Sequence, residues 1–448
     1  MTNTMKHSAS REQNNACISS AEAQPMFEQK LKHSGIPWIG DIPNHWEVEL
    51  IGNHIKEVDC PNSANNESNA LQFKMGTIIP KKGGDSKYNP ETLESYNIVE
   101  KGDIIINGLN LSFDFISQRV GLVKEKGVIT SAYLAVRPDK AINSEYLTYL
   151  FKAYDNCKAF HGMGKGLRQT LAYKEFKTNL IFVPPLTEQK AIADYLDKHC
   201  AEVDEMVSLQ EKIIEELRAY RQAIITETVT RGLNPNAPMK DSGVEWIGQI
   251  PEGWEMERIK NDSVFINGYA FNSDSFTIND GVKVIRIGDI GSSIDYDNCA
   301  KSTEINDSLA AYLIRENDIL IAMSGATTGK SCLAKNIQEA YINQRVGIIR
   351  SKLYHFISYV LQASYIFEYI NLNNAGSAQP NISGQAIGNI PIPIPSLAEQ
   401  QAIAAFLDKK CSEIDKLIAI KQKKVDELKE YKKSLIYEYV TGKKQPIL

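Results

Sequence analysis

Two stretches of the chain, residues 186–232 and 397–441, carry apolar side chains in alternating steps of four and three positions. A mean step of about 3.5 residues is typical of the seam along which two α-helices pack as a coiled coil. At 1.5 Å per residue, a helix of about 45 residues is roughly 65 Å long. The pattern therefore predicts two long spacer helices that pair antiparallel. The predicted seam positions are Ile192, Leu196, Val203, Met206, Ile213, Leu217, Tyr220, Ile224, Ile403, Leu407, Ile414, Leu417, Leu428, Tyr431 and Leu435.

Polar residues occupy several steps of this pattern. His199 and Gln210 interrupt the first helix, and Lys410, Lys421 and Lys424 interrupt the second. The interruptions predict a looser seam along part of the second helix. The lysines could face a partner protein or solvent, and we expect solvent.

Local signals mark the ends of both helices. Pro184 and Pro185 end an extended segment before the first helix, and Ser396 with Glu399 forms an S-x-x-E capping box before the second. Residues 233–238 contain two prolines and cannot continue a helix. The predicted segments are a flexible polar tail (1–30), a first globular domain (31–185), a central helix (186–232), a linker (233–238), a second globular domain (239–396), a C-terminal helix (397–441) and a short tail (442–448).

Each predicted globular domain mixes helix and strand. Residues 103–106 and 318–321 are short apolar runs after polar turns, which is typical of buried strands. Residues 145–160 and 355–370 carry an amphipathic helical pattern at matching positions. The predicted fold class is therefore α+β, with two mixed α/β domains joined by the two long helices of an antiparallel coiled coil.

The chain also repeats itself. The segment SGIPWIGDIPNHW at 34–46 recurs as SGVEWIGQIPEGW at 242–254, and these two copies hold all four tryptophans. A second pair begins with PPLTEQKAIADYLD at Pro184 and IPSLAEQQAIAAFLD at Ile394. A fixed period of about 210 residues indicates a tandem duplication, and hence a pseudo-twofold internal repeat.

The middle of each repeat is different. Between 55–140 and 265–350 the similarity mostly vanishes. Duplex DNA suits a pseudo-twofold protein, because paired modules read paired half-sites. Under this hypothesis the divergent segments read unlike half-sites, giving an asymmetric, split target. Neutral drift after duplication explains the divergence equally well.

Composition narrows the possible classes of protein. The chain has 448 residues, of which 43% are hydrophobic, enough for two or three domains. We find no apolar run near the roughly 18 residues that a membrane-spanning helix requires. Residues 1–30 lack the apolar stretch of a secretory signal, so a cytoplasmic location is expected. The formal charge of −5 argues against binding to nucleic acid through overall positive charge, so DNA contacts would come from local patches.

Several motifs together resemble a known family. They are WIG-x-IP-x-x-W, GMGKGLRQTL, GSAQPNISG, and the doubled PPLTEQKAIA and PSLAEQQAIA that precede the long helices. Over residues 31–445 the chain resembles the DNA-specificity subunit of type I restriction-modification enzymes, which serve bacterial defence. The resemblance implies two target-recognition domains that bind a bipartite DNA sequence.

The same resemblance implies partners and cofactors. Two methyltransferase subunits would dock on this chain and methylate adenine at N6 on opposite strands, using S-adenosylmethionine. Restriction subunits that use ATP and Mg²⁺ would join them to cleave unmethylated DNA. No cofactor is expected in this chain itself.

Two glycine-bearing segments, 162–169 and 376–381, have side chains suited to reading DNA bases. Arginine can form a fork onto guanine, and the amides of glutamine and asparagine can pair with adenine. A turn leading to the last strand of each domain explains the same segments. The candidate contacts are Lys165, Arg168, Gln169, Gln379 and Asn381.

Residues 325–331 nearly match a phosphate-binding loop, but Ser324 stands where G-x-x-x-x-G-K-[ST] requires glycine, so ATP binding is not expected. Hydroxyls, backbone N–H groups and a lysine suit a DNA phosphate or base edge, and a purely structural turn explains them as well. The basic segment 81–84 suits a phosphate, although a solvated lysine pair is the simpler interpretation. The candidates here are Ser324, Thr327, Thr328, Lys330, Lys81 and Lys82.

The sequence offers no catalytic constellation. Glu188 and Glu399 each begin a helix, where helix capping is the stronger interpretation than acid catalysis. The seven cysteines are odd in number and never form C-x-x-C, which predicts neither a disulfide framework nor a zinc site. No glycine-rich S-adenosylmethionine loop follows a strand, which weakens the hypothesis of a fused methyltransferase-nuclease. The leading hypothesis is a non-catalytic DNA-specificity subunit, and the alternative is a coiled-coil scaffold that organises partner proteins without reading DNA.

Overall fold

The computed structural model describes residues 30–36, 38–81, 90–113, 118–165, 169–373 and 380–446. Residues 1–29 of the predicted tail lie outside the described residues. The chain divides into two compact units. Unit 1 holds residues 1–205 with 428–448, and unit 2 holds residues 206–427, so that each unit takes a part of both long helices.

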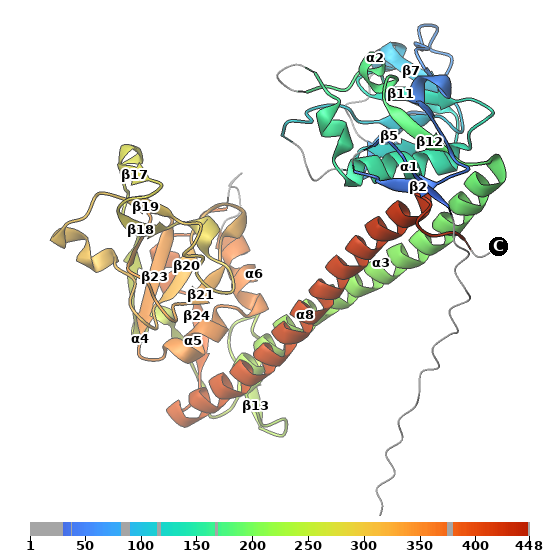
Figure 1. The fold of residues 1–448 in the computed structure, drawn as a ribbon. Coiled ribbons are helices and arrows are strands. Elements are labelled where there is room, and N and C mark those ends of the chain that lie inside the picture. The colour runs from blue at the N-terminus through green and yellow to red at the C-terminus, as the bar shows by residue number, and fades with distance from the viewer. Residues whose placement is uncertain are drawn as a thin grey trace, which may run out of the picture. The chain divides into compact units, whose positions relative to one another are not determined.

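Unit 1 is built on a four-stranded antiparallel sheet of order β4-β11-β8-β9. Figure 1 labels β11, a central strand of this sheet. The strand pairs β1-β2, β12-β3, β10-β7 and β5-β6 surround it. The strands are β1 (Leu31–His33), β2 (Asp41–Pro43), β3 (Glu47–Leu50), β4 (Ile55–Glu57), β5 (Leu71–Lys74), β6 (Thr77–Pro80), β7 (Tyr96–Val99), β8 (Ile104–Ile106), β9 (Val120–Leu122), β10 (Gly127–Thr130), β11 (Leu134–Pro138) and β12 (Leu180–Val183). The helices that begin in this unit are α1 (Ser144–Asn156), α2 (Tyr173–Phe176) and α3 (Leu186–Arg231).

Unit 2 repeats this plan with a four-stranded antiparallel sheet of order β16-β23-β20-β21. It also has a second four-stranded sheet of order β17-β19-β18-β22, in the segment whose sequence diverges most. The strands are β13 (Met239–Asp241), β14 (Gln249–Pro251), β15 (Glu255–Arg258), β16 (Ser263–Asn267), β17 (Phe276–Thr277), β18 (Val282–Ile285), β19 (Ala300–Ser302), β20 (Ile319–Ala322), β21 (Ser331–Leu333), β22 (Ala340–Ile342), β23 (Val346–Ser351) and β24 (Pro391–Ile394). The helices are α4 (Ile259–Asp262), α5 (Tyr354–Val360), α6 (Ser364–Asn373), α7 (Gly384–Gly388) and α8 (Leu397–Val440).

The core of each unit includes the end of one long helix and the start of the other. In unit 1, Ile192 and Leu196 of α3 pack in the same core as Ile436 and Val440 of α8. In unit 2, Ile225 of α3 packs in the core with the opening residues of α8. Since the end of one helix meets the start of the other in both units, α3 and α8 run antiparallel.

Ion pairs join the two helices inside each unit. In unit 1, Lys432 Nζ of α8 lies 2.7 Å from Asp204 Oδ2 of α3. In unit 2, Arg221 Nε of α3 lies 3.1 Å from Asp415 Oδ1 of α8. The two pairs occupy equivalent positions of the sequence repeat, so the duplication extends to individual helix contacts.

Many predicted seam positions are buried. Ile213, Leu217 and Ile224 are half-buried. The buried positions are Ile192, Leu196, Val203, Ile403, Leu407, Ile414, Leu428 and Leu435.

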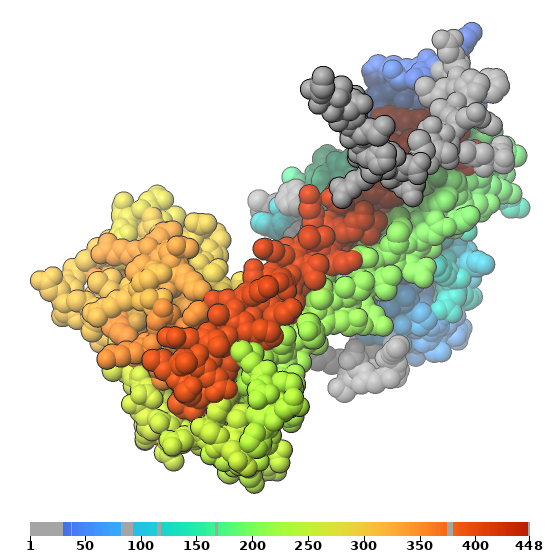
Figure 2. Space-filling model, turned by 90° about the horizontal axis from the view of Figure 1, so that it is seen from below, coloured from blue at the N-terminus to red at the C-terminus, as the bar shows by residue number. Residues whose placement is uncertain are grey.

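The predicted seam is wrong elsewhere. Gln210 and Lys421 are half-buried, because the 3.5-residue period continues through these polar side chains. Four residues further along, Ile214 and Val425 are buried, whereas their neighbours Ile213 and Lys424 are more exposed. Lys421 therefore belongs to the helix contact, whereas Lys424 is exposed as expected. Figure 2 shows α8 in red, with one side of the helix open to solvent along much of its length. The exposed positions are Met206 (44%), Tyr220 (56%), Leu417 (47%) and Tyr431 (55%).

The predicted helix 355–370 is broken into α5 and α6. The carbonyl of Gln362 accepts a hydrogen bond from the side chain of Gln222, on α3. The backbone N–H of Ser364 donates to Thr226 Oγ1, also on α3, at 2.9 Å. These contacts use backbone groups that a continuous helix would pair internally, which gives a physical reason for the break. No helix in the part of the chain that the structure describes is long and apolar enough to cross a membrane.

Candidate nucleic-acid interface

In unit 1, a loop of residues 107–113 follows the sheet strand β8. The guanidinium of Arg119 lies beneath it and donates through Nη1 to the carbonyls of Asn107 and Leu109, at 2.8 Å each. Arg119 is fully buried, with 0% of its surface exposed. Because a buried carbonyl needs a donor, this one cation fixes the path of the loop.

Arg119, the residue just before β9, also ties this loop to helix α1 through its backbone. The backbone N–H of Arg119 donates to Asp155 Oδ2 of α1 at 2.7 Å. Burial raises the pKa of Asp155 above its usual range, although the backbone bond and the charge of Arg119 favour its ionised form. The residue that supports the loop is therefore itself held by the buried carboxyl of Asp155.

A second loop of unit 1 packs directly against the first. The backbone N–H of Leu111 donates to the carbonyl of Gln169 at 3.2 Å, and that of Leu171 donates to the carbonyl of Gly108 at 2.9 Å. A Cβ placed at Gly108 would lie 2.8 Å from the backbone oxygen of Leu171. This close approach of two backbones is the reason that glycine is needed there.

The predicted base-reading residues of unit 1 lie in this second loop. The side chain of Lys165 is 76% exposed, and its Nζ lies 3.3 Å from Glu175 Oε1. That contact lowers the pKa of the Glu175 carboxyl. Gln169 adopts a left-handed backbone conformation, with φ of 45°. Arg168 lies outside the described residues, as does Lys82 of the other basic segment, whose neighbour Lys81 follows strand β6.

In unit 2, the loop 323–330 follows β20, the strand that corresponds to β8. Its residue Gly325 donates its backbone N–H to the carbonyl of Pro380 at 2.9 Å, and the N–H of Ile382 donates to the carbonyl of Met323 at 2.9 Å. An isolated β-bridge joins Ser324 to Asn381. Two segments proposed separately from the sequence are therefore neighbours. Gln379 lies outside the described residues.

The hydroxyls of this loop have different surroundings. Thr328 Oγ1 donates to the carbonyl of Gly325 at 2.7 Å and lies 3.1 Å from that of Pro380, so it serves the turn itself. Thr327 Oγ1 is buried, with no hydrogen-bond partner among the described residues. Lys330 is exposed at the end of the loop. Strand β21 follows at once, so a phosphate here would not face a helix N-terminus as in a nucleotide-binding loop.

Each unit thus has an equivalent pair of loops at the equivalent point of its own sheet. The surfaces differ: asparagines, an aromatic ring, a lysine and a glutamine in unit 1, and hydroxyls, a lysine and an asparagine in unit 2. The second-loop residues of both units were predicted from the sequence. The loop 107–113 was missed, although the run N-G-L-N-L-S after a predicted strand was a turn signal.

Each sheet also holds a buried carboxylate that the sequence analysis did not single out. Asp103, before β8, accepts two hydrogen bonds from Arg137 of β11, at 2.6 and 2.8 Å. Asp318 and Arg350 form the same bidentate pair in unit 2, at 2.7 and 2.6 Å. The carboxylate raises the pKa of the arginine in both cases. The pairs clamp neighbouring strands and thereby fix the base from which each recognition loop leaves.

The tryptophan motif and the Glu-Gln motif of each repeat are mutual partners. Trp46 Nε1 donates to Glu188 Oε2 at 2.9 Å, and Trp254 Nε1 donates to Glu399 Oε2 at 2.9 Å. The Glu399 N–H lies 3.4 Å from Ser396 Oγ, which is half of the predicted capping box. The glutamates thus hold the buried tryptophans, a role that the capping interpretation overlooked.

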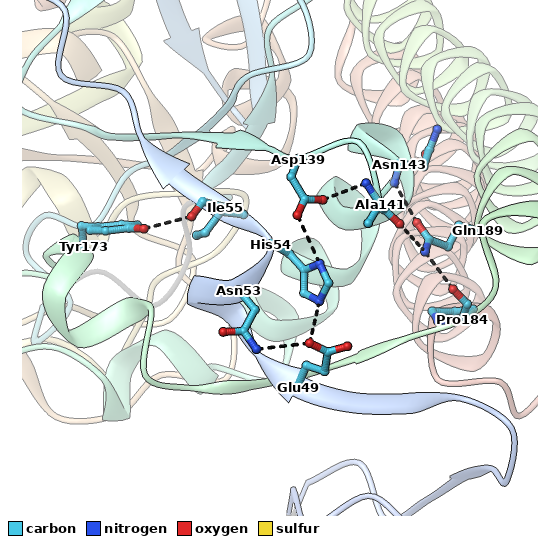
Figure 3. Close-up of polar contacts among 10 residues, drawn as sticks. All are labelled: Glu49, Asn53, His54, Ile55, Asp139, Ala141, Asn143, Tyr173, Pro184 and Gln189. Carbon is cyan, nitrogen blue, oxygen red and sulfur yellow. Dashed lines mark hydrogen bonds and ion pairs between the residues drawn. The ribbon is translucent and has the colours of Figure 1, made fainter.

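Gln189 links α3 to the segment before α1 (Figure 3). Its Oε1 accepts the backbone N–H of Asn143 at 2.7 Å, and its Nε2 donates to the carbonyl of Pro184 at 2.8 Å. In the same view, His54 lies between two carboxylates, 3.2 Å from Glu49 and 3.7 Å from Asp139. Gln189 fastens the segment before α1 to the long helix, and His54 joins β3 to the end of β11, so we assign both residues a structural role.

No group of three or more His, Cys, Asp or Glu side chains that could hold a metal ion occurs among the described residues. The geometry of both loop pairs is that of a polar contact surface with rigid support.

Comparison with known proteins decides the family. The model described as the type I restriction modification DNA specificity domain matches residues 63–219 and 251–430, one match for each repeat. The chain belongs to the family of type I restriction-modification specificity subunits. The fold of such a subunit, two target-recognition domains of mixed helix and strand, is the fold seen here.

Relatives with this description match all or part of the chain. The type I restriction enzyme MjaVIII specificity subunit of Methanocaldococcus jannaschii is 29% identical over 420 residues, which cover 90% of this chain and 93% of the relative. The EcoKI specificity subunit of Escherichia coli strain K12 is 27% identical over 205 residues, or 44% of each chain. This specificity subunit is thus similar to the MjaVIII relative over both repeats and to the EcoKI relative over less than half of its length.

A solved structure supports the fold. It is described as "Structural basis underlying complex assembly and conformational transition of the type I R-M system", and one of its chains matches with a TM-score of 0.65 at 17% identity. The match covers 90% of this specificity subunit and 99% of that chain.

Proposed function

We propose that this specificity subunit recognises an asymmetric, bipartite DNA sequence, one half through each unit. The observation that carries the proposal is the repeated frame with unlike loops. The loops 107–113 and 323–330 leave equivalent strands and pack against equivalent segments, yet their sequences, NGLNLSF and MSGATTGK, differ. A duplicated frame with divergent loops suits two half-sites of different sequence, in the way that paired modules read paired DNA sites.

The side chains of each loop pair suit base and phosphate contacts. In unit 1, the amide of Gln169 can pair with the N6 and N7 of adenine, and the ammonium of Lys165 can contact a phosphate. In unit 2, the amide of Asn381 can reach a base edge and Lys330 can contact the backbone, whereas the buried hydroxyl of Thr327 would have to turn outward to reach a base. These residues, with Arg168, Lys81, Lys82, Ser324, Thr328 and Gln379, remain candidates for DNA contact.

We further propose that catalysis belongs to partner subunits. Two adenine-N6 methyltransferase subunits would carry S-adenosylmethionine, and restriction subunits would carry ATP and Mg²⁺. The net charge of −5 supports this division, because the chain alone offers little energy from the release of counterions from DNA. The partners would supply much of the phosphate contact, in the cytoplasm where the DNA is accessible.

A genome-wide map of modified bases tests the proposal. The map would be compared between the host, a strain lacking this gene and a complemented strain. We expect one split adenine-methylated motif to disappear with the gene and to return with it. If every methylated motif persists in the deleted strain, the chain does not direct methylation, and the scaffold hypothesis gains support.

A further inference from the structure

Among the described residues of the unit 1 recognition loops, one large apolar side chain is exposed. Phe113, at the end of the loop 107–113, has 76% of its surface accessible to solvent. Exposing an aromatic ring gives up the free energy that burial would provide. Single exposed apolar residues are common on proteins, so the surroundings of the ring have to decide whether it has a role.

The ring stands on a rigid base. Leu111, two residues earlier, is fully buried, with 0% exposure. The backbone N–H of Phe113 donates to the carbonyl of Asn110 at 3.1 Å, which closes a tight turn. The side chain of Asn107 accepts the N–H of Leu109 at 3.2 Å, on the stretch held by Arg119. Because its support is already ordered, placing this ring against a ligand costs little conformational entropy.

The loop that carries the ring also packs against the loop that carries the candidate base-reading groups. Leu111 is hydrogen bonded to the backbone of Gln169, so the loop that ends in Phe113 packs on the loop that carries Lys165. A cation, an amide and an aromatic ring match the three parts of a nucleotide, namely its phosphate, its base edge and its base face. An apolar protein partner would not require the first two.

We propose that Phe113 packs its ring on a base face within the half-site bound by unit 1, and so acts as a stacking residue for recognition. This inference rests on the proposed function. In unit 2, the corresponding loop 323–330 contains serine, alanine and threonines and no aromatic residue. The two halves of the target are then engaged by different chemistry, by stacking in one half and by polar contacts in the other.

The test uses the complex of the full chain with its methyltransferase subunits. The probes are short duplexes that carry the motif found by modification mapping, and the variants are Phe113→Ala, Phe113→Leu and Phe113→Trp. Loss of a stacked aromatic residue should weaken specific binding by about 5- to 100-fold. We expect Phe113→Ala to show this loss, Phe113→Trp to bind within about 3-fold of the wild type, and Phe113→Leu to fall between them. Leu180→Ala, at a partly exposed apolar position elsewhere in unit 1, is the matched control and should bind normally.

A double-mutant cycle locates the base. Abasic sites are placed one at a time through the target, and each duplex is measured with wild type and with Phe113→Ala. At one nucleotide of the unit 1 half-site, we expect the two losses to be strongly non-additive, and elsewhere to be additive. Additive losses at every position, or normal binding by Phe113→Ala, would overturn the inference while leaving the proposed function intact. A wild-type complex that does not prefer its motif over random duplex would instead overturn the proposed function.

Discussion

Arg119 shows how much one buried side chain can decide at a recognition surface. No motif in the sequence singles it out, and its importance comes from where the chain brings it. Its guanidinium supplies the hydrogen bonds that hold the carbonyls of Asn107 and Leu109 inside unit 1. A loop fixed in this way presents its side chains in one geometry.

Replacing Arg119 by leucine should loosen this loop. Both carbonyls would lose their donor, and an unpaired buried polar group costs about 1–3 kcal/mol. We expect the free energy of unfolding of unit 1 to fall by about 2–4 kcal/mol, and amide hydrogen exchange in 107–113 to speed up. Lys101→Leu, at an exposed turn of the same unit, is the control and should change neither quantity. Unchanged exchange in the loop would show that other contacts hold it.

The glutamates that hold the tryptophans give a matched pair of tests. Glu188→Ala and Glu399→Ala should each lower the free energy of unfolding by about 1.5–3 kcal/mol, because a buried indole N–H loses a charged acceptor. Glutamine at either position keeps an acceptor and should cost less. Chemical denaturation monitored by tryptophan fluorescence measures both. Equal losses for alanine and glutamine would contradict the assigned hydrogen bond.

Lys330 should act on DNA through charge alone. Removing one phosphate contact lowers the slope of log K against log salt by about 0.9 and weakens binding similarly for all sequences. We expect this signature for Lys330→Ala in the complex, measured by titrating duplex DNA at several salt concentrations. Lys212→Ala, at a side chain that is 72% exposed on α3, is the control. A change in sequence preference would instead show that Lys330 reads a base.

For single residues, the sequence indicated the exposed side chains of the recognition surface better than the buried residues that hold its loops in place. Lys165, Gln169, Ser324 and Asn381 stand out because glycines, amides and cations cluster around them, and the structure brings the last two together. Phe113 did not stand out, because an isolated phenylalanine in a sequence is expected in the core and only the structure shows it exposed.

The long helices show where periodicity predicts well and where it fails. Their existence follows from a pattern sustained over many turns. The phase of the seam was lost after Gln210 and Lys421, because the prediction took a step of three to 213 and 424 where the structure takes a step of four to Ile214 and Val425. A helix cannot skip a step to avoid a polar residue, so polar side chains also occupy contact positions. The Oε1 atom of Gln210 is buried without a hydrogen-bond partner among the described residues.

Two adjacent isoleucines test this phase. Ile214 is buried, with 4% exposure, whereas Ile213 is half-buried. Ile214→Ala should cost about 2–4 kcal/mol of unfolding free energy through lost burial and a residual cavity, and Ile213→Ala should cost clearly less. Thermal and chemical denaturation of both variants give the comparison. The opposite order would restore the seam that the sequence predicted.

For the whole molecule, duplication was the most informative feature of the sequence. Both copies of the tryptophan motif and of the Glu-Gln motif were visible in the sequence. In each unit, the tryptophan motif is hydrogen bonded to the Glu-Gln motif. The sequence did not predict which segments of the chain make up each unit. Sequence repeats follow the order of the chain, whereas packing joins the end of α8 to unit 1 and the end of α3 to unit 2. No local sequence pattern indicates which unit each helix end packs into.

The central claim is that each unit reads its own half of a split target. The most direct measurement is a base-modification map of cells that express a chimera in which residues 55–180 come from a relative with a different known target. We predict that one half of the methylated motif changes to that of the relative while the other half is unchanged. A chimera that changes both halves at once, or neither, while still directing methylation would contradict the claim.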